Sequence, residues 1–182
     1  MEFKLTEEQL MIRQAARDFA NNECLPGVIE RDEHQKFPYD QVMKLSELGF
    51  MGMMISPDYG GSGLDAVSYV LAMEEISKVD ASTSVCMSVN NSLVCYGIEA
   101  FGTEDQKKKY LTPLAQGQKD GKLYIGAFLL SEPEAGSDAV SVAAVYTAVF
   151  LRIALTSAFD TRSVAVQPFR SYSAMHCSAN PL

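Results

Sequence analysis

The sequence has few of the residues from which metal centres and disulfide scaffolds are built. It contains no tryptophan, two histidines and four cysteines in 182 residues. The cysteines are Cys24, Cys86, Cys95 and Cys177. They form no CxxC pair, and no histidine stands near them at zinc-ligand spacing, so a structural zinc site is excluded. We therefore expect reduced, buried or half-buried thiols, as in cytoplasmic proteins.

The chain is also short of positive charge. It carries 15 Lys and Arg against 23 Asp and Glu, which gives a net charge of −8. A nucleic-acid partner is not expected, because phosphate neutralisation needs a basic face. A nucleotide ligand is compatible with this charge, since backbone N–H groups at a helix start or tight turn can hold phosphate. No basic segment followed by an apolar run opens the chain, so no secretory signal is predicted and a cytoplasmic location is expected.

A change of composition near residue 138 divides the chain. Residues 139–182 contain no Lys and no Glu and are rich in Ala, Ser and Val. Within them, the apolar stretch 139–159 is long enough to span a membrane, but its central Arg152 would cost about 2.5–3.5 kcal/mol there. No membrane span is therefore expected. The segment is typical of a disordered or poorly folded, aggregation-prone tail.

Local signals predict helices in the first part of the chain. Thr6 with Gln9 has the spacing of a capping box, in which side chain and backbone bond each other at a helix start. Thr103 with Gln106 has the same spacing. Pro113 has no N–H to donate, so we expect it to limit the helix that follows Thr103.

Longer patterns complete the fold prediction. Asp65 can cap a helix with one buried apolar face. That face consists of Val67, Val70, Met73 and Ile76. The stretch 82–101 is apolar on every side, which is typical of a helix buried in a bundle, and residues 123–130 (LYIGAFLL) favour a buried strand. We predict a mainly α fold, with a helical domain over residues 1–118 and the start of a β domain at 119–138.

Four sequence motifs follow one another in a recognisable order. They are the opening LTEEQLMIRQAARDFA, the loop PDYGGSG, the pair NNSL and FGTEDQKKKYL, and SEPEAGSD at 131–138. Alone, SEPEAGSD would be an ordinary polar loop between strands. As an ordered set the motifs resemble the acyl-CoA dehydrogenase family, with most similarity to short-chain or butyryl-CoA dehydrogenases. The resemblance implies the amino-terminal helical bundle of that family, followed by the start of a truncated β domain.

The SEPEAGSD turn also has chemistry suited to a flavin. Ser131, directly after a strand, offers a hydroxyl and an N–H to the polar edge of an isoalloxazine ring. Gly136 has no Cβ, so the backbone there can approach a pyrophosphate closely, and Ser137 adds a hydroxyl donor. The resemblance implies FAD as the cofactor. It places Phe128, Leu130 and Ser131 near the flavin ring, and Gly136 and Ser137 near its phosphates.

The helical stretch 82–101 contains candidates for a substrate site. The resemblance implies that this helix borders the acyl pocket, with Leu93, Tyr96 and Gly97 on its wall and Ser137 on the CoA side. The alternative is ordinary core packing, which is the usual role of apolar helix positions. The acyl chain length does not follow from the sequence, because the pocket floor depends on other segments of the family.

The resemblance implies α,β-dehydrogenation of an acyl-CoA thioester to trans-2-enoyl-CoA. A carboxylate removes the α proton in this reaction, and the β hydrogen leaves as hydride to the flavin. The base of the family is a Glu in its carboxy-terminal helical domain. No Glu here matches that position, so no catalytic residue is predicted. The implied partners are an electron-transferring flavoprotein and, for an intact chain, further copies of itself.

After Asp138 the sequence departs from the family. The Gly-x-Lys-x-x-Ile-Thr-Asn-like strand pair that packs on the flavin is replaced by AVSVAAVYTAVFLRIALTSAFDTRSV. The abrupt loss of Lys and Glu favours a frameshift as the origin of residues 139–182. We therefore expect a truncated chain that is inactive alone and holds no FAD. The alternative is a non-enzymatic helical interaction module, or a partner chain of an intact dehydrogenase.

Overall fold

The computed structural model describes residues 4–128 and 149–151. Its helical elements, with η marking 3-10 and π turns, are α1 (Glu7–Phe19), η1 (Ala20–Cys24), α2 (Val28–Glu33), α3 (Tyr39–Glu47), η2 (Phe50–Gly52), η3 (Pro57–Tyr59), α4 (Ala66–Ser77), α5 (Ala81–Ser88), η4 (Val89–Cys95), α6 (Tyr96–Phe101), α7 (Glu104–Gln106), η5 (Lys107–Leu111) and α8 (Thr112–Gln116). The strands are β1 (Gln118–Lys119), β2 (Lys122–Leu123), β3 (Ile125–Gly126) and β4 (Val149–Leu151). The predicted mainly α fold is confirmed.

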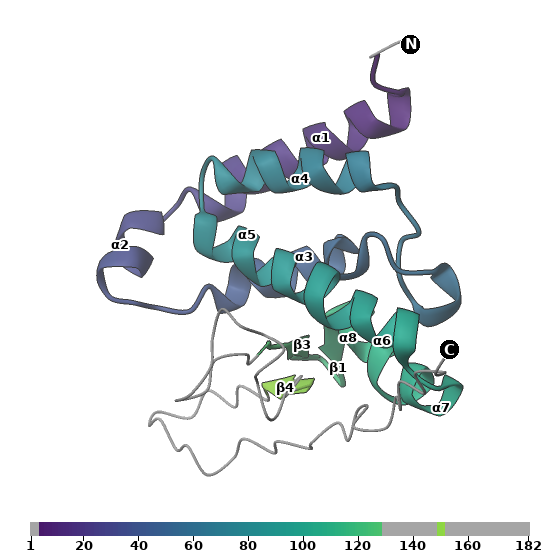
Figure 1. Cartoon of the computed structure of the whole chain (residues 1–182). Coiled ribbons are helices and arrows are strands. Elements are labelled where there is room, and N and C mark those ends of the chain that lie inside the picture. The colour runs from purple at the N-terminus through teal and green to yellow at the C-terminus, as the bar shows by residue number, and fades with distance from the viewer. Residues whose placement is uncertain (1–3, 129–148, 152–182) are drawn as a thin grey trace, which may run out of the picture.

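The helices form two core clusters. The larger cluster joins α1, α3, α4 and α5 with the inward side chains of β2 and β3. The smaller one joins η4, α6, η5 and α8 around Ile55. Figure 1 shows α1 lying along α4, with the run from α5 to α6 crossing beneath them and the strands below that run. In the part of the chain that the structure describes, no helix is long and apolar enough to cross a membrane.

The predicted helix starts are confirmed. The Gln9 N–H donates to Thr6 Oγ1 at 3.2 Å, and the Thr6 N–H donates to Gln9 Oε1 at 3.1 Å. The same reciprocal pair joins Thr103 and Gln106. Asp65 caps α4 by accepting the backbone N–H three residues later. These contacts need only neighbouring residues, which is why sequence spacing is enough to predict them.

The predicted buried face of α4 is wrong in part. Ile76 is buried as expected, but Val67 and Val70 are 47% and 59% exposed. Ala72 and Glu75 take inner positions instead. Because α4 carries apolar side chains on more than one side, its spacing alone did not decide which side meets α1.

The run α5–η4–α6 is one continuous helix with an open side. Met87, Val94 and Ile98 are buried, whereas Val85 is 58% exposed. The expectation that the stretch 82–101 is buried all round is therefore wrong for the described molecule. Its core contacts come from one side only.

Pro113 does not end the helix that contains it. The helical run η5–α8 continues through this residue to Gln116, and Gly117, with φ of 70°, ends it. Pro113 occupies the first turn of α8, directly after the π turn η5. The proline therefore lies where the helical run changes from π to α geometry, and it continues the run instead of ending it.

β structure begins with a tight hairpin. Strands β1 and β2 pair antiparallel across a two-residue turn formed by Asp120 and Gly121. These residues have φ of 52° and 69°, the left-handed conformation that type I′ hairpin turns require. An Asp-Gly pair is a strong hairpin signal that the sequence analysis did not use.

The next strand pairs with a segment much later in the chain. In the antiparallel pair β3–β4, Ile125 lies opposite Leu151 and Gly126 lies opposite Val149. Within the described residues, the predicted strand 123–130 is thus two short strands, β2 and β3. The division of the chain into three units stays a prediction.

Candidate functional site

Two consecutive buried amides tie η4 to the rest of the molecule. Asn90 and Asn91 are both 0% exposed. Asn91 Nδ2 donates to the carbonyls of Phe50 and Met87, each at 2.9 Å. Its Oδ1 accepts the Met53 N–H at 2.7 Å. The Asn91 amide therefore uses both donors and its acceptor to fix the η2 turn against η4.

Asn90 connects η4 to elements further along the chain. Its Nδ2 donates to the Met51 carbonyl at 2.8 Å and to the Leu114 carbonyl at 2.9 Å. Its Oδ1 accepts the Gly126 N–H at 2.9 Å. One side chain thus joins η2, α8 and β3 to η4.

Strand β3 lies directly against η4 at the same place. A Cβ built on Gly126 would be 2.4 Å from Val94 Cγ1. Only glycine lets the strand backbone come this close to the helix. Since Phe128 follows two residues later, the Asn90–Gly126 contact fixes where the chain leaves the helices.

The structure places four of the predicted site residues. Phe128, Leu93 and Tyr96 are 37%, 45% and 58% exposed. A Cβ on Gly97 would meet no heavy atom within 4 Å. Core packing is therefore the wrong interpretation of Leu93 and Tyr96 in the described part of the chain, because neighbouring side chains make the core contacts. Their role in an acyl pocket stays a prediction. The predicted flavin residues Leu130, Ser131, Gly136 and Ser137 lie outside the described residues.

The residues that the structure describes fit the apolar part of a flavin or acyl ligand. The exposed side chains of Leu93 and Phe128 belong to the two segments that meet at the Asn90–Gly126 contact. Ligand sites are lined mainly by such aliphatic and aromatic groups, with a few placed donors. The donors that sequence analysis predicts belong to residues 131–137.

The glycine-rich loop that contains η3 makes hydrogen bonds to the backbone of the preceding segment. The Ser62 N–H donates to the Gly52 carbonyl and the Gly63 N–H to the Ile55 carbonyl, both at 2.9 Å. A Cβ on Gly61 would be 2.1 Å from the Ile55 carbonyl oxygen. These glycines let the loop fold back on the chain before it.

The carboxyl groups of Glu75, Glu30 and Asp65, whose pKa values are lowered, act as ion-pair partners or helix caps. Hydrogen bonding from Arg17 lowers the pKa of Glu75 to about 2. Hydrogen bonding from Lys36 lowers the pKa of Glu30, and the Ser68 N–H lowers that of Asp65. A general base works best with a pKa near the working pH, so these groups do not have the pKa of a catalytic base. Among the described residues, no cluster of His, Cys, Asp and Glu could hold a metal ion.

Three of the four cysteines lie in the described part, and they are free thiols. Burial raises the pKa of Cys24 and Cys86 to about 11 and that of Cys95 to about 12. A thiol with a raised pKa is a poor nucleophile at neutral pH. Cys24 and Cys95 are buried and Cys86 is half-buried, as expected.

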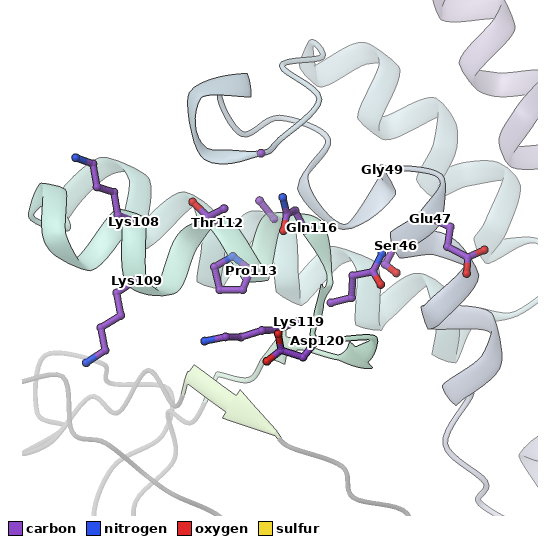
Figure 2. Close-up of a pocket in the computed structure, with 13 residues that line it drawn as sticks. Ser46, Glu47, Gly49, Lys108, Lys109, Thr112, Pro113, Gln116, Lys119 and Asp120 are labelled. Carbon is purple, nitrogen blue, oxygen red and sulfur yellow. The ribbon is translucent and has the colours of Figure 1, made fainter.

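A wide groove lies on another part of the surface. It has a volume of about 840 Å³ and runs between the end of α3, η5–α8 and the β1–β2 turn. Its lining residues are Ser46, Glu47, Gly49, Gly60, Lys108, Lys109, Thr112, Pro113, Ala115, Gln116, Gln118, Lys119 and Asp120. Figure 2 shows Lys108 and Lys109 pointing to opposite sides of their helix, and Lys119 lying beside Asp120. The cations do not converge on one point, so the groove has no assembled anion site.

The roles of Asn90 and Asn91 do not follow from the NNSL motif that contains them. Two adjacent amides inside an otherwise apolar helix are themselves a signal, because a buried amide without partners is costly. That signal predicts backbone partners, but it does not say which ones.

Comparisons with known proteins agree with this arrangement. Residues 6–118 match the family described as "Acyl-CoA dehydrogenase, N-terminal domain". Over 138 residues the chain is 48% identical to the short-chain specific acyl-CoA dehydrogenase of Clostridium acetobutylicum. That match covers 76% of this chain and 35% of the relative. The chain thus spans about a third of the length of the curated relatives it matches.

Solved structures give the same result. The butyryl-CoA dehydrogenase of Megasphaera elsdenii matches with a TM-score of 0.69 and 41% identity, covering 76% of this chain and 36% of that one. An acyl-CoA dehydrogenase of Bacillus anthracis, solved in complex with FAD, matches with a TM-score of 0.66 and 33% identity, covering 76% and 23%. The matched family domain takes up more than half of the sequence. The chain therefore belongs to the acyl-CoA dehydrogenase family.

Proposed function

We propose that this chain provides the amino-terminal helical domain and the first flavin-contacting segment of an FAD-dependent short-chain acyl-CoA dehydrogenase. The observation that carries the proposal is the docking of β3 on η4. It brings the strand that leads into SEPEAGSD beside the helix with the exposed Leu93 and Tyr96. A flavin and an acyl chain could then lie between these two segments.

In this proposal each residue has a role that follows from the chemistry of its side chain. Leu93 and Tyr96 line the acyl pocket and keep water from it. Phe128 contributes apolar surface, Ser131 donates to the polar edge of the flavin ring, and Ser137 donates near the phosphates and the CoA moiety. FAD, when bound, supplies the acceptor for the β hydride. The base is expected from another segment, as in the family.

The remaining parts of the proposal concern partners and the tail. The substrate would be an acyl-CoA thioester, and electrons would pass to an electron-transferring flavoprotein. The intact protein would be a cytoplasmic homo-oligomer. Residues 139–182 would be an aberrant tail. The 182-residue chain by itself is then expected to show no flavin absorbance, because its sequence leaves the flavin-packing pattern after residue 138.

A second candidate function is a non-enzymatic helical interaction module. The exposed Val85, Leu93 and Tyr96 on one helical run favour it, because a partner helix could cover them. The two proposals differ in whether residues 1–138 can form part of a flavin site. A module needs no flavin, whereas an enzyme domain must complete a flavin site.

A hybrid protein tests the proposal. Residues 1–138 would replace the matching segment of the Clostridium acetobutylicum relative, with the unmodified relative as the positive control. We expect the purified hybrid to carry the yellow flavin band and to oxidise a short-chain acyl-CoA. A second hybrid with Ser131→Ala and Ser137→Ala should retain less flavin. A well-folded first hybrid without flavin would contradict the enzyme proposal and favour the interaction module.

A further inference from the structure

We propose that Asn90 is a positioning residue: it sets the place of β3, the strand that leads into the next segment of the chain, separately from its contribution to the helical core. The proposal rests on the proposed function in one respect, since that segment is taken to contact the flavin. Asn90 itself contacts neither flavin nor substrate in this proposal. It acts through the backbone N–H of Gly126.

The contacts of Asn90 divide into two groups. Its Nδ2 donates to Met51 and Leu114, which belong to the helical part of the chain. Its Oδ1 accepts from Gly126, which belongs to β3. The amide is 0% exposed, so water cannot replace either group of contacts. A single rigid side chain therefore links the position of β3 to the position of η2 and α8.

Only an amide fits these partners. Two carbonyl oxygens need donors, and one N–H needs an acceptor, at the same buried point. A carboxylate would present an oxygen to the two carbonyls, and an aliphatic side chain would remove all three hydrogen bonds, leaving the Leu114 carbonyl only its bond from the Gly117 N–H. The residue type thus follows from the three elements that meet there.

The local helix geometry supports a special role for this position. Asn90 and Asn91 lie in η4, a π-helical segment of seven residues inside an otherwise α-helical run. Such segments occur frequently at functional sites, and η4 is the longest of the three in the described residues. Val94, in the same segment, makes the close contact with Gly126. One π-helical segment therefore supplies both the hydrogen bond and the surface that hold β3.

Asn91 provides a matched control. It has the same side chain, the same burial and the same number of backbone partners as its neighbour. Its partners are Phe50, Met53 and Met87, all in the helical part. Replacing Asn91 should loosen the bundle without releasing β3 selectively.

The test uses the 182-residue chain and amide hydrogen exchange measured by NMR. The exchange rate of the Gly126 N–H is divided by that of the slowest core amides, so that a loss of global stability cancels. In Asn90→Ala this ratio should rise by about tenfold, because a tenfold change in exchange corresponds to the net free energy of about one hydrogen bond. In Asn91→Ala it should stay near the wild-type value. Equal ratios in the two variants would overturn the proposal.

Two further variants keep the test decisive if Asn90→Ala does not fold. Asn90→Asp keeps an acceptor for Gly126 but loses the donors, so the exchange ratio should stay near that of the wild type while global stability falls. That stability should partly return at acidic pH, where the protonated carboxyl can donate to one carbonyl. Gly126→Ala should also raise the ratio, because its Cβ displaces the strand from Val94 while the donors of Asn90 keep their partners.

These outcomes are independent of the flavin. If the exchange ratios behave as expected but the hybrid protein holds no flavin, Asn90 still positions β3 and the enzyme proposal fails. If the hybrid holds flavin but Asn90→Asp loses Gly126 protection as fully as Asn90→Ala, the positioning role fails.

Discussion

The molecule joins its elements in two contrasting ways. Around η4 the joints are made by the neutral amides of Asn90 and Asn91, which are fully buried. Between α1 and α4 the joint includes an ion pair, Arg17 with Glu75 at 2.9 Å, in which the Arg17 side chain is 44% exposed. Water cannot replace a lost partner of a fully buried amide, whereas it can solvate a half-exposed charge whose partner is removed. Burial, more than charge, should therefore decide how much each joint contributes to stability.

A third joint lies between these extremes. Arg31, with a side chain 16% exposed, contacts Asp80, whose side chain is 4% exposed, at 2.9 Å. Arg31 also donates to the carbonyls of Cys24 and Pro26. Asp80 in turn caps α5 by accepting the Thr83 N–H. This pair holds α2 and the end of η1 to the start of α5.

The largest effect is expected from Asn91→Ala. The change removes the side-chain hydrogen bonds to the Met53 N–H and to the carbonyls of Phe50 and Met87, all at a fully buried position. Unpaired buried groups cost about 1–3 kcal/mol each, so we expect a loss of about 3–4 kcal/mol in the free energy of unfolding, measured by urea denaturation. Ser92→Ala is the control, because the Ser92 hydroxyl bonds only a carbonyl of its own helix. A loss no larger than that of the control would show that the buried amide is dispensable.

The second effect is expected from Arg31→Met. The variant keeps much of the side-chain volume but leaves the buried Asp80 carboxylate without its cation. Breaking a buried pair from one side costs about 3–5 kcal/mol, and the remaining Thr83 cap reduces this to about 2–3 kcal/mol here. The double variant with Asp80→Asn should recover part of the loss, because the uncompensated charge is gone. If the double variant is less stable than Arg31→Met, the charge is not the cause.

Contacts between residues close in the chain could be predicted from the sequence, and contacts between distant helices could not. The caps at Thr6, Asp65 and Thr103 were predicted correctly because each involves partners three residues away. The exposed sides of α4 and of α5–α6 were not, because they depend on which distant helix packs where. Val67 and Val70 had the spacing of core residues and lie outside.

The candidate site shows the same division. The SEPEAGSD motif and its neighbours were enough to predict the family, because the motif order is a property of the sequence. The link from Asn90 to Gly126 joins residues 36 apart in the chain. The exposure of Leu93 and Tyr96 depends on which elements pack against their helix. Spacing within a helix carries no information about such contacts.

A smaller, pH-dependent effect is expected at the half-exposed joint. Hydrogen bonding by Arg17 lowers the pKa of Glu75 from its ordinary value of 4.5 to about 2. The pair is therefore fully stabilising above about pH 4.5, and its contribution is lost as the pH falls toward about 2. Glu75→Gln should be less stable than the wild type at neutral pH, and the gap between their denaturation midpoints should close on acidification. A gap that is constant with pH would mean that packing, not ionisation, is responsible.

The smallest effect is expected from the shortest of these ion-pair contacts. Lys36 Nζ lies 2.6 Å from Glu30 Oε1, yet the two side chains are 54% and 64% exposed. Water solvates both groups in the folded and in the unfolded chain, and ordering two long side chains has an entropic cost. Lys36→Ala should therefore leave the denaturation midpoint unchanged, although the pKa of Glu30 should rise toward its ordinary value because its main partner is gone. A clear loss of stability that disappears at high salt would show that an exposed pair can match the buried joints, and that distance outweighs burial in this fold.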